Sequence, residues 1–292
     1  MRKGLAFAGM SVALTTPFRD GLVDVAALRS QVEFQIEAGA TCLCPVGTTG
    51  ESPTLTHEEH ERVISEVVQA AAGRIKVMPG TGSNSTSEAL RLTRWAAREG
   101  ADAALVVAPY YNKPTQEGLN RHFRAMIDEG GLPAMLYHIP SRGSAPIEIE
   151  TVARVAEAGG VVGLKETGGV DRITRLCADT DVPVFSGDDG LTLPMMALGA
   201  VGVVSVTSNV RPRDVVRLVR AMAASDLVEA RRSHDALTPL VDALFLESNP
   251  IPVKQALAME GHLEEATVRL PLVDASPYVV DALRAALDAV PA

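Results

Sequence analysis

Eight short apolar runs recur along the chain, and longer segments with helical periodicity lie between them. The runs are rich in Val, Leu and Ala and do not alternate polar with apolar residues. That composition is typical of parallel strands that are buried on both faces. We therefore predict strands at residues 8–14, 41–46, 76–79, 103–108, 134–137, 161–165, 182–185 and 201–206.

Start and stop signals mark the helices between these strands. Thr56 and Glu59 have the spacing of a capping box and precede the apolar residues Val63 and Ile64. Further helices are expected after residues 87, 115, 149, 170, 191 and 212. Glycines stand where most of these helices should end, as C-cap glycines do: Gly39, Gly73, Gly100, Gly130, Gly159 and Gly199.

Eight strand–helix units predict an α/β fold, a (β/α)8 TIM barrel over residues 1–224. Residues 225–292 are predicted to form a C-terminal helical appendage that packs on the barrel. Its helices are expected at 225–246, 252–259 and 277–290. The alternative is a doubly wound open sheet, which needs a glycine-rich phosphate turn after an early strand. Gly80-Thr81-Gly82 lacks the third glycine of such a turn, so the barrel is favoured.

Composition limits the classes of function. A chain of 292 residues that is 47% hydrophobic and 22% charged is an ordinary globular protein. Its net charge of −9 disfavours nucleic acid and anionic membranes as partners. Three cysteines cannot form a disulfide framework, and no apolar run is as long as a membrane helix. We expect a cytoplasmic protein.

Polar and titratable residues gather after the predicted strands, at the end of a barrel where active sites lie. Lys165 closes the apolar run 161–164. Burial there would favour the neutral amine, which can condense with a ketone to give an imine. An ion pair with Glu166 is the alternative interpretation.

Neighbouring strand ends supply groups that could serve such an amine. Tyr137 could shuttle protons, or could be an ordinary core tyrosine. Thr48 and Thr49 lie in a glycine-flanked turn that could bind a carboxylate, or could be a tight turn without a ligand. Arg142 could hold a second carboxylate, or could be a solvated loop residue.

Six motifs together resemble the pyruvate-dependent class I aldolases of the dihydrodipicolinate synthase and N-acetylneuraminate lyase family. They span the chain in the family's order: GTTGES at 47–52, PYYNKP at 109–114, YHIPSR at 137–142, GLKE at 163–166, SGDD at 186–189 and NPIPVK at 249–254. The Thr-Thr pair and the Ser-Arg pair resemble the synthase branch more than the lyases.

The resemblance implies condensation of pyruvate with aspartate-4-semialdehyde, giving 4-hydroxy-tetrahydrodipicolinate in the diaminopimelate route to lysine. No cofactor and no metal are implied. It implies that Lys165 forms the imine, that Tyr137 is the general acid/base and that Thr49 and Tyr111 complete a proton relay. It also implies the residues that bind substrate: Thr48 and Thr49 for the pyruvate carboxylate, Arg142 for the second carboxylate, and the backbones of Gly187 and Val204.

Assembly and regulation also follow from the resemblance. The residue matching Tyr111 reaches into a neighbouring subunit's site in this family, so a homo-oligomer is implied, with a tetramer as a dimer of dimers. Free L-lysine binds at a dimer interface in the inhibited members, at positions that match Ser52, His57, His60, Asn84, Glu88 and Tyr110.

Two residues depart from the family's pattern, and three alternatives stay open. His138 replaces an asparagine and Gly143 a threonine, both expected beside the second-substrate pocket. The alternatives are another aldolase of the superfamily acting on a sugar acid or 4-hydroxy-2-oxoglutarate, a non-catalytic lysine-binding paralogue, and a metal-dependent aldolase. His57 and His60 are three residues apart, whereas a zinc helix of this type spaces its histidines by four.

Overall fold

The computed structural model describes residues 3–290, and its centre is a ring of eight parallel strands. The ring order is β5-β4-β1-β10-β9-β8-β7-β6. Gly80 and Leu105 bridge β5 to β6, where the Leu105 amide donates to the Pro79 carbonyl at 2.9 Å. The sheet therefore closes, and the predicted barrel is confirmed. Its strands are β1 (Gly9–Ala13), β4 (Cys42–Cys44), β5 (Lys76–Val77), β6 (Ala104–Val107), β7 (Ala134–His138), β8 (Val161–Glu166), β9 (Val184–Ser186) and β10 (Gly202–Ser205).

The barrel interior is packed with side chains. Nearly every residue of the eight strands is buried, which explains why the strands read as continuous apolar runs. A Cβ placed on Gly163 would lie 2.8 Å from the Phe185 ring. Only glycine at this position of β8 leaves room for that ring.

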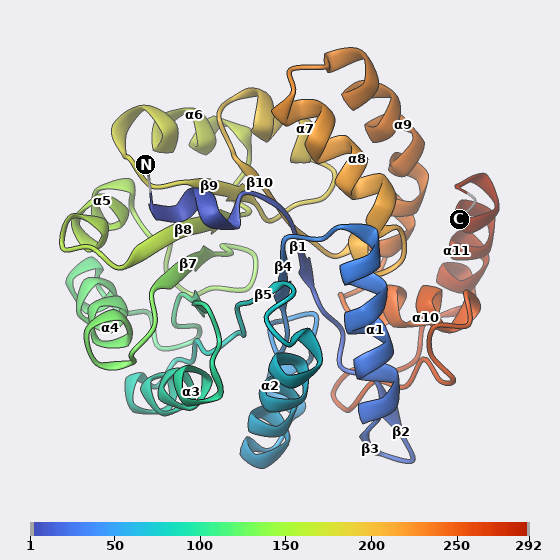
Figure 1. Ribbon diagram of the computed structural model, residues 1–292, viewed down its shortest axis with the longest axis horizontal. Helices are drawn as coiled ribbons and strands as arrows, with labels where there is room; N and C mark the ends of the chain where they lie inside the picture. Colours follow the sequence, from blue (N-terminus) through green and yellow to red (C-terminus); the bar gives the residue numbers. More distant parts are fainter. Residues whose placement is uncertain (1–2, 291–292) are drawn as a thin grey trace.

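Helices surround the strands on the outside of the barrel (Figure 1). The capping box forms as predicted: the Glu59 amide donates to Thr56 Oγ1 at 3.2 Å, and the Thr56 amide donates to Glu59 Oε2 at 3.0 Å. A short hairpin of β2 (Phe18–Arg19) and β3 (Leu22–Val23) precedes the first helix and was not predicted. The barrel helices are α1 (Val25–Ala38), α2 (His57–Ala71), α3 (Thr86–Glu99), α4 (Gln116–Glu129), α5 (Ile149–Glu157), α6 (Val170–Asp179), α7 (Thr192–Ala197) and α8 (Pro212–Ala223).

Three helices form the C-terminal appendage, α9 (Leu227–Leu244), α10 (Ile251–Met259) and α11 (Pro277–Ala289). They lie together at one side of the barrel (Figure 1). The buried Arg211 ties this side of the barrel to the appendage. It donates to the Val290 carbonyl at 2.8 Å and pairs with Glu260 at 2.7 Å. Apolar residues of the three helices belong to the same core cluster as the barrel strands.

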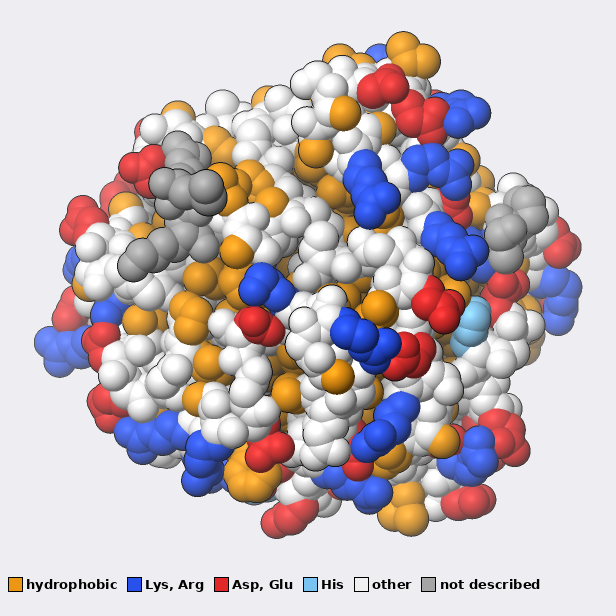
Figure 2. Space-filling view, viewed as in Figure 1, with side chains coloured by type: hydrophobic (Ala, Val, Ile, Leu, Met, Phe, Trp, Pro, Cys, Tyr) orange, Lys and Arg blue, Asp and Glu red, His pale blue; other side chains and the backbone are white. Residues whose placement is uncertain are grey.

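The surface carries interspersed charges of both signs on the face shown in Figure 2, where no wide basic field stands out. No helix within residues 3–290 is both long and apolar enough to span a membrane.

Candidate active site

Lys165 and Tyr137 lie side by side at the carboxyl ends of β8 and β7, where they are paired in register. Both side chains are 5% exposed and line a cavity of about 980 Å³. The Lys165 Nζ atom is 4.3 Å from the centre of the Tyr137 ring. A Cβ on Gly187 would lie 3.0 Å from Lys165 Cε. The glycine therefore lets the lysine side chain extend across β9 into the cavity.

Lys165 has no carboxylate within ion-pair distance among residues 3–290, so the alternative of a Glu166 ion pair is wrong. Successive residues of a strand point to opposite faces, and Glu166 points away from the cavity. Its carboxylate instead pairs with His138 Nδ1 at 2.6 Å and with Arg172 Nε at 2.8 Å. The lysine amine is thus left for a ligand.

Glu166 and His138 are buried at the ends of β8 and β7, and Arg172 is partly buried beside them. Burial alone would raise the pKa of Glu166, but hydrogen bonds from His138 and Arg172 outweigh it and hold that pKa below its usual value. The Gly168 amide also donates to Glu166 Oε1, at 2.5 Å. His138 is therefore occupied behind β7 and, like Gly143, lines neither cavity of the site. Their neighbours Tyr137, Ile139 and Arg142 line the cavities, whereas these two residues do not.

The turn after β4 presents Thr48 and Thr49 to the cavity. Its shape is fixed by backbone hydrogen bonds from Glu51 to Thr48 O at 3.1 Å and from Ser52 to Gly47 O at 3.2 Å. Thr49 Oγ1 accepts a hydrogen bond from Asn249 Nδ2 at 2.9 Å. Because that bond uses the oxygen as an acceptor, the Thr49 hydroxyl proton remains available to a ligand or to another side chain.

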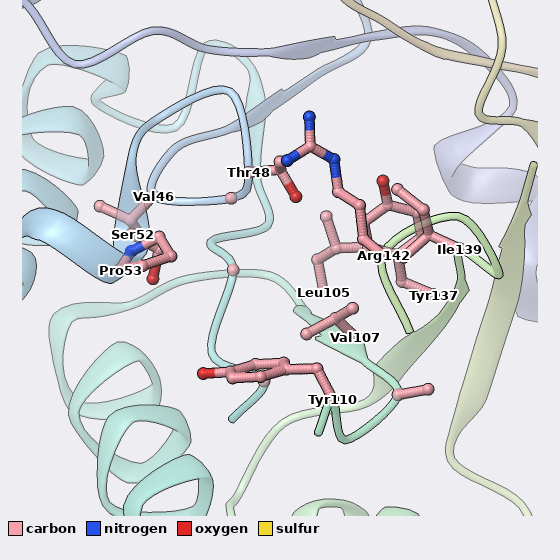
Figure 3. Close-up of a pocket in the computed structure, with 14 residues that line it drawn as sticks. Val46, Thr48, Ser52, Pro53, Leu105, Val107, Tyr110, Tyr137, Ile139 and Arg142 are labelled. Carbon is pink, nitrogen blue, oxygen red and sulfur yellow. The ribbon is translucent and has the colours of Figure 1, made fainter. Parts of the chain in front are cut away.

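Arg142 lies on the loop after β7 and lines the large cavity. Its Nη2 donates to the Asn249 carbonyl at 3.2 Å, which holds the guanidinium at the barrel mouth. Arg142, Thr48 and Tyr137 also line a smaller cavity of about 220 Å³. Figure 3 shows this second cavity, with Tyr110 on the side opposite the Arg142 guanidinium.

Two of the expected site residues do not reach either cavity. Tyr111 is 89% exposed and has a left-handed backbone, φ 72°. Val204 is fully buried in β10, and Val206 lines the large cavity in its place. Within the described chain, the structure thus brings together Lys165, Tyr137, Thr48, Thr49, Arg142 and Gly187, but not Tyr111 or Val204.

The residues matched to a lysine site lie around the smaller cavity and near the start of α3. Ser52 and Tyr110 line that cavity. His57 Nε2 is 3.4 Å from Glu88 Oε1. His60 is buried, and burial together with the charge of Arg91 lowers its pKa to about 4.

Asn84 also belongs to this set and is joined to the loop after β6. Its carbonyl accepts a hydrogen bond from Asn112 Nδ2 at 2.9 Å. Over residues 3–290, no three His, Cys, Asp or Glu side chains form a group that could hold a metal ion, the pair His57 and His60 included.

Three residues to which the sequence assigned no role lie against the site. Asn249 contacts both Thr49 and Arg142. Glu51 ends the Thr48–Thr49 turn and pairs with Lys254 at 2.5 Å, both side chains being fully buried. The available signals were the GTTGES motif at 47–52 and the NPIPVK motif at 249–254, which marked both segments but did not show what they contact.

Known proteins resemble this chain over nearly its whole length. A family model described as the dihydrodipicolinate synthetase family matches residues 6–290. The 4-hydroxy-tetrahydrodipicolinate synthase of Syntrophus aciditrophicus is 52% identical over 270 residues, covering 91% of this chain and 92% of that protein. The enzyme of the same name from Aquifex aeolicus is 50% identical over 285 residues, covering 96% and 97%.

Solved structures give the same result. The crystal structure of dihydrodipicolinate synthase from Aquifex aeolicus superposes with a TM-score of 0.94 at 49% identity, over 97% of each chain. An Acinetobacter baumannii dihydrodipicolinate synthase complexed with pyruvate gives 0.94 at 42% identity, over 97% and 99%. A lysine-bound enzyme from Cyanidioschyzon merolae gives 0.94 at 39%, over 98% of each. This chain therefore belongs to the dihydrodipicolinate synthetase family.

Proposed function

We propose that this chain is a lyase that condenses pyruvate with aspartate-4-semialdehyde to give 4-hydroxy-tetrahydrodipicolinate, through an imine on Lys165. The observation that carries the proposal is a buried lysine amine with no carboxylate partner among residues 3–290, beside a tyrosine and inside a cavity with anion-binding groups. Relatives at about half sequence identity have the corresponding enzyme name.

The chemistry begins at the lysine. The lone pair of Lys165 Nζ attacks the keto carbon of pyruvate, and loss of water gives the imine. Loss of a methyl proton then gives an enamine, whose carbon attacks the aldehyde carbon of the second substrate. The substrate's own amine displaces Lys165 and closes the ring, so the overall reaction releases one water.

Each of these steps moves a proton, and Tyr137 is the group placed to carry it. Its ring contacts the lysine amine, and its side chain lines both cavities. A tyrosine hydroxyl can serve as general acid and general base when neighbouring hydroxyls relay the proton. Thr49, whose hydroxyl proton is free to donate, is the relay group on the cavity side.

Two sets of anion-binding groups line the cavity and suit two acidic substrates. The amides and hydroxyls of Thr48 and Thr49 suit the carboxylate of pyruvate. Arg142 is fixed by Asn249 and suits the carboxylate of the semialdehyde. Gly187 supplies an open backbone position beside Lys165, and Val204 supports it from the neighbouring strand β10.

We propose further that the working enzyme is a homo-oligomer, as a dimer of dimers. Tyr111 would complete the relay in a neighbouring subunit's site. Its high exposure and its distance from this chain's own cavities support that role. Within each subunit, residues 1–224 would form the barrel and 225–292 a helical subdomain that closes one side of the mouth through Asn249.

The lysine amine gives a direct test of the function. The protein is incubated with pyruvate, reduced with borohydride and mapped by peptide mass. A pyruvyl adduct on Lys165 is expected, and an adduct absent from that residue would contradict the mechanism. Product formation is then compared between aspartate-4-semialdehyde, sugar-acid aldehydes and the aldehyde partner for 4-hydroxy-2-oxoglutarate. A higher rate with either of the others would reassign the second substrate.

Free L-lysine is proposed as a feedback inhibitor, bound at Ser52, His57, His60, Asn84, Glu88 and Tyr110. The carboxylate of Glu88 suits the ligand's ammonium group, and Ser52 and Tyr110 line the smaller cavity. Titration with L-lysine should lower the rate. Unchanged rate and no heat of binding at millimolar ligand would reject the effector site.

A further inference from the structure

A second lysine, Lys254 of α10, is buried more deeply than Lys165. Its side chain is 0% exposed, and its Nζ lies 2.5 Å from Glu51 Oε1. The same Nζ lies 4.1 Å from the centre of the Phe18 ring. Burial lowers the pKa of this lysine to about 8, against the opposing effect of Glu51. The amine therefore faces a carboxylate and an aromatic ring, and it lines neither cavity of the site.

Both oxygens of Glu51 are occupied by the appendage. Oε1 pairs with Lys254, and Oε2 accepts the Arg269 amide at 3.0 Å. Arg269 is itself held by both oxygens of Glu59, each at 2.6 Å, at the start of α2. The carboxylate is thus fixed from several directions and has little freedom to move.

Glu51 is also the last residue of the turn that presents Thr48 and Thr49. Its backbone is left-handed, φ 54°, and its amide donates to the Thr48 carbonyl at 3.1 Å. Non-glycine residues hold that conformation only when their surroundings enforce it. The side chain of this residue is the one that Lys254 contacts from outside the barrel.

Stability alone is a poor explanation for such a pair. Taking two charges out of water costs several kcal/mol for each ion, and apolar side chains of similar size often stabilise as well or better. What apolar side chains cannot supply is a directional contact that fixes the position of the turn. The position of the pair beside the turn is therefore a better guide to its role than its contribution to the stability of the fold.

We propose that Glu51 and Lys254 are a positioning pair that holds the Thr48–Thr49 turn in the geometry that binds the pyruvate carboxylate. This inference rests on the proposed function, since it concerns the same substrate. Neither residue touches the substrate. Their effect passes through the backbone hydrogen bond to Thr48 and, on the appendage side, through the segment that carries Asn249.

The chain offers a matched control in Arg211 and Glu260. This pair also joins the appendage to the barrel, at 2.7 Å, and its arginine is buried. It lines neither cavity and makes no contact with the Thr48–Thr49 turn. Breaking it removes a comparable structural contact without disturbing the proposed carboxylate site.

The experiment compares Glu51→Gln and Lys254→Met with Glu260→Gln and Arg211→Met, at a temperature where circular dichroism shows all of them folded. For the first two, the KM for pyruvate and the half-saturating pyruvate for borohydride trapping should both rise about tenfold. Their kcat should fall as well, because the same turn carries the proposed relay group Thr49, whereas borohydride trapping reports capture of pyruvate without the aldol step. The two control variants should keep the wild-type KM.

The double variant Glu51→Gln/Lys254→Met protects the test against misfolding, since it leaves no unpaired buried charge. It should fold and still show the raised KM for pyruvate. A KM that rises no more than in the controls would overturn the inference, even if stability falls. Failure of the proposed function would look different, because wild-type protein would then form no pyruvate adduct.

Discussion

The barrel mouth around Lys165 and the junction around Lys254 are two regions built on the same residue type. Each lysine is buried against an aromatic ring, at 4.3 Å from Tyr137 and 4.1 Å from Phe18. Lys254 has a carboxylate at 2.5 Å and no cavity, whereas Lys165 has a cavity and no carboxylate within ion-pair distance over residues 3–290. Burial of a lysine therefore does not identify a nucleophile. The absence of a charge partner and the presence of space for a ligand do.

The largest expected effect is that capture of pyruvate is lost when Lys165 is replaced and is kept when Lys254 is replaced. Lys165→Ala should lower kcat by at least about 10³-fold and abolish borohydride trapping, because the attacking amine is gone. Lys254→Met should still trap pyruvate on Lys165 when the ligand is saturating. Mass mapping of both reduced proteins checks the result, and an adduct on Lys254 in the first variant would contradict the comparison.

The next effect concerns the ring beside the Lys165 amine. Tyr137→Phe keeps the ring but removes the hydroxyl, and kcat should fall by about 10²–10⁴-fold because proton transfer loses its carrier. Phe18→Leu, beside the other lysine, removes a ring with no proposed chemical role and should leave kcat nearly unchanged. Steady-state rates at saturating substrates measure both, and equal losses would remove Tyr137 from the mechanism.

The free energy of unfolding should respond in the opposite order, because replacing Lys254 should lower it more than replacing Lys165. Lys254→Met leaves Glu51 buried without its partner and should lower the free energy of unfolding by about 3–5 kcal/mol. Lys165→Met removes an amine that has no carboxylate partner among residues 3–290 and should not lower this free energy by more than about 1 kcal/mol. Both values are obtained from the denaturant midpoints, provided that the free energy of unfolding falls with denaturant at the same slope in each protein. Similar losses in the two variants would show that their environments do not differ as described.

The smallest effect concerns His122 of α4, a buried histidine that has no ion-pair partner among residues 3–290. Burial lowers its pKa to about 4 from 6.5, so the folded protein binds this proton less well than the unfolded chain does. Stability is complete above pH 6.5 and should fall by about 2 kcal/mol as the pH drops from 6.5 to 4.5.

The matched variant His122→Asn separates this contribution from the rest of the acid response. It removes the titrating ring and should flatten that part of the dependence of stability on pH. His60, whose pKa is also lowered to about 4, would keep its own share of the slope. If the stability of the variant depended on pH between 4.5 and 6.5 as steeply as that of the wild type, the assignment to His122 would be contradicted.

Local signals in the sequence predicted most of the architecture. The eight apolar runs correspond to the eight barrel strands, and the Thr56–Glu59 capping box begins α2 as expected. Such features depend on residues close together in the chain, so periodicity and spacing reveal them. The placement of Lys165 and Tyr137 at strand ends followed from the same pattern. The β2–β3 hairpin was missed because its strands are only two residues long.

Contacts between distant segments could not be predicted in the same way. Glu51 and Lys254 are 203 residues apart, and Thr49 and Asn249 are 200 apart. His138 was expected beside the pocket. Because side chains alternate along β7, it points to the opposite face of the strand from Tyr137 and pairs with Glu166. No spacing rule relates residues whose proximity arises only when the barrel closes and the appendage docks.

The order of amino acids by itself determined the barrel, the end of it where the candidate site lies, and the lysine and tyrosine that meet there. Tertiary structure alone decided which buried lysine is paired and which is left open to a ligand. The physical reason is that strand and helix patterns are set by neighbouring residues. The pairing of charges depends instead on which distant carboxylate folding brings within a few ångströms.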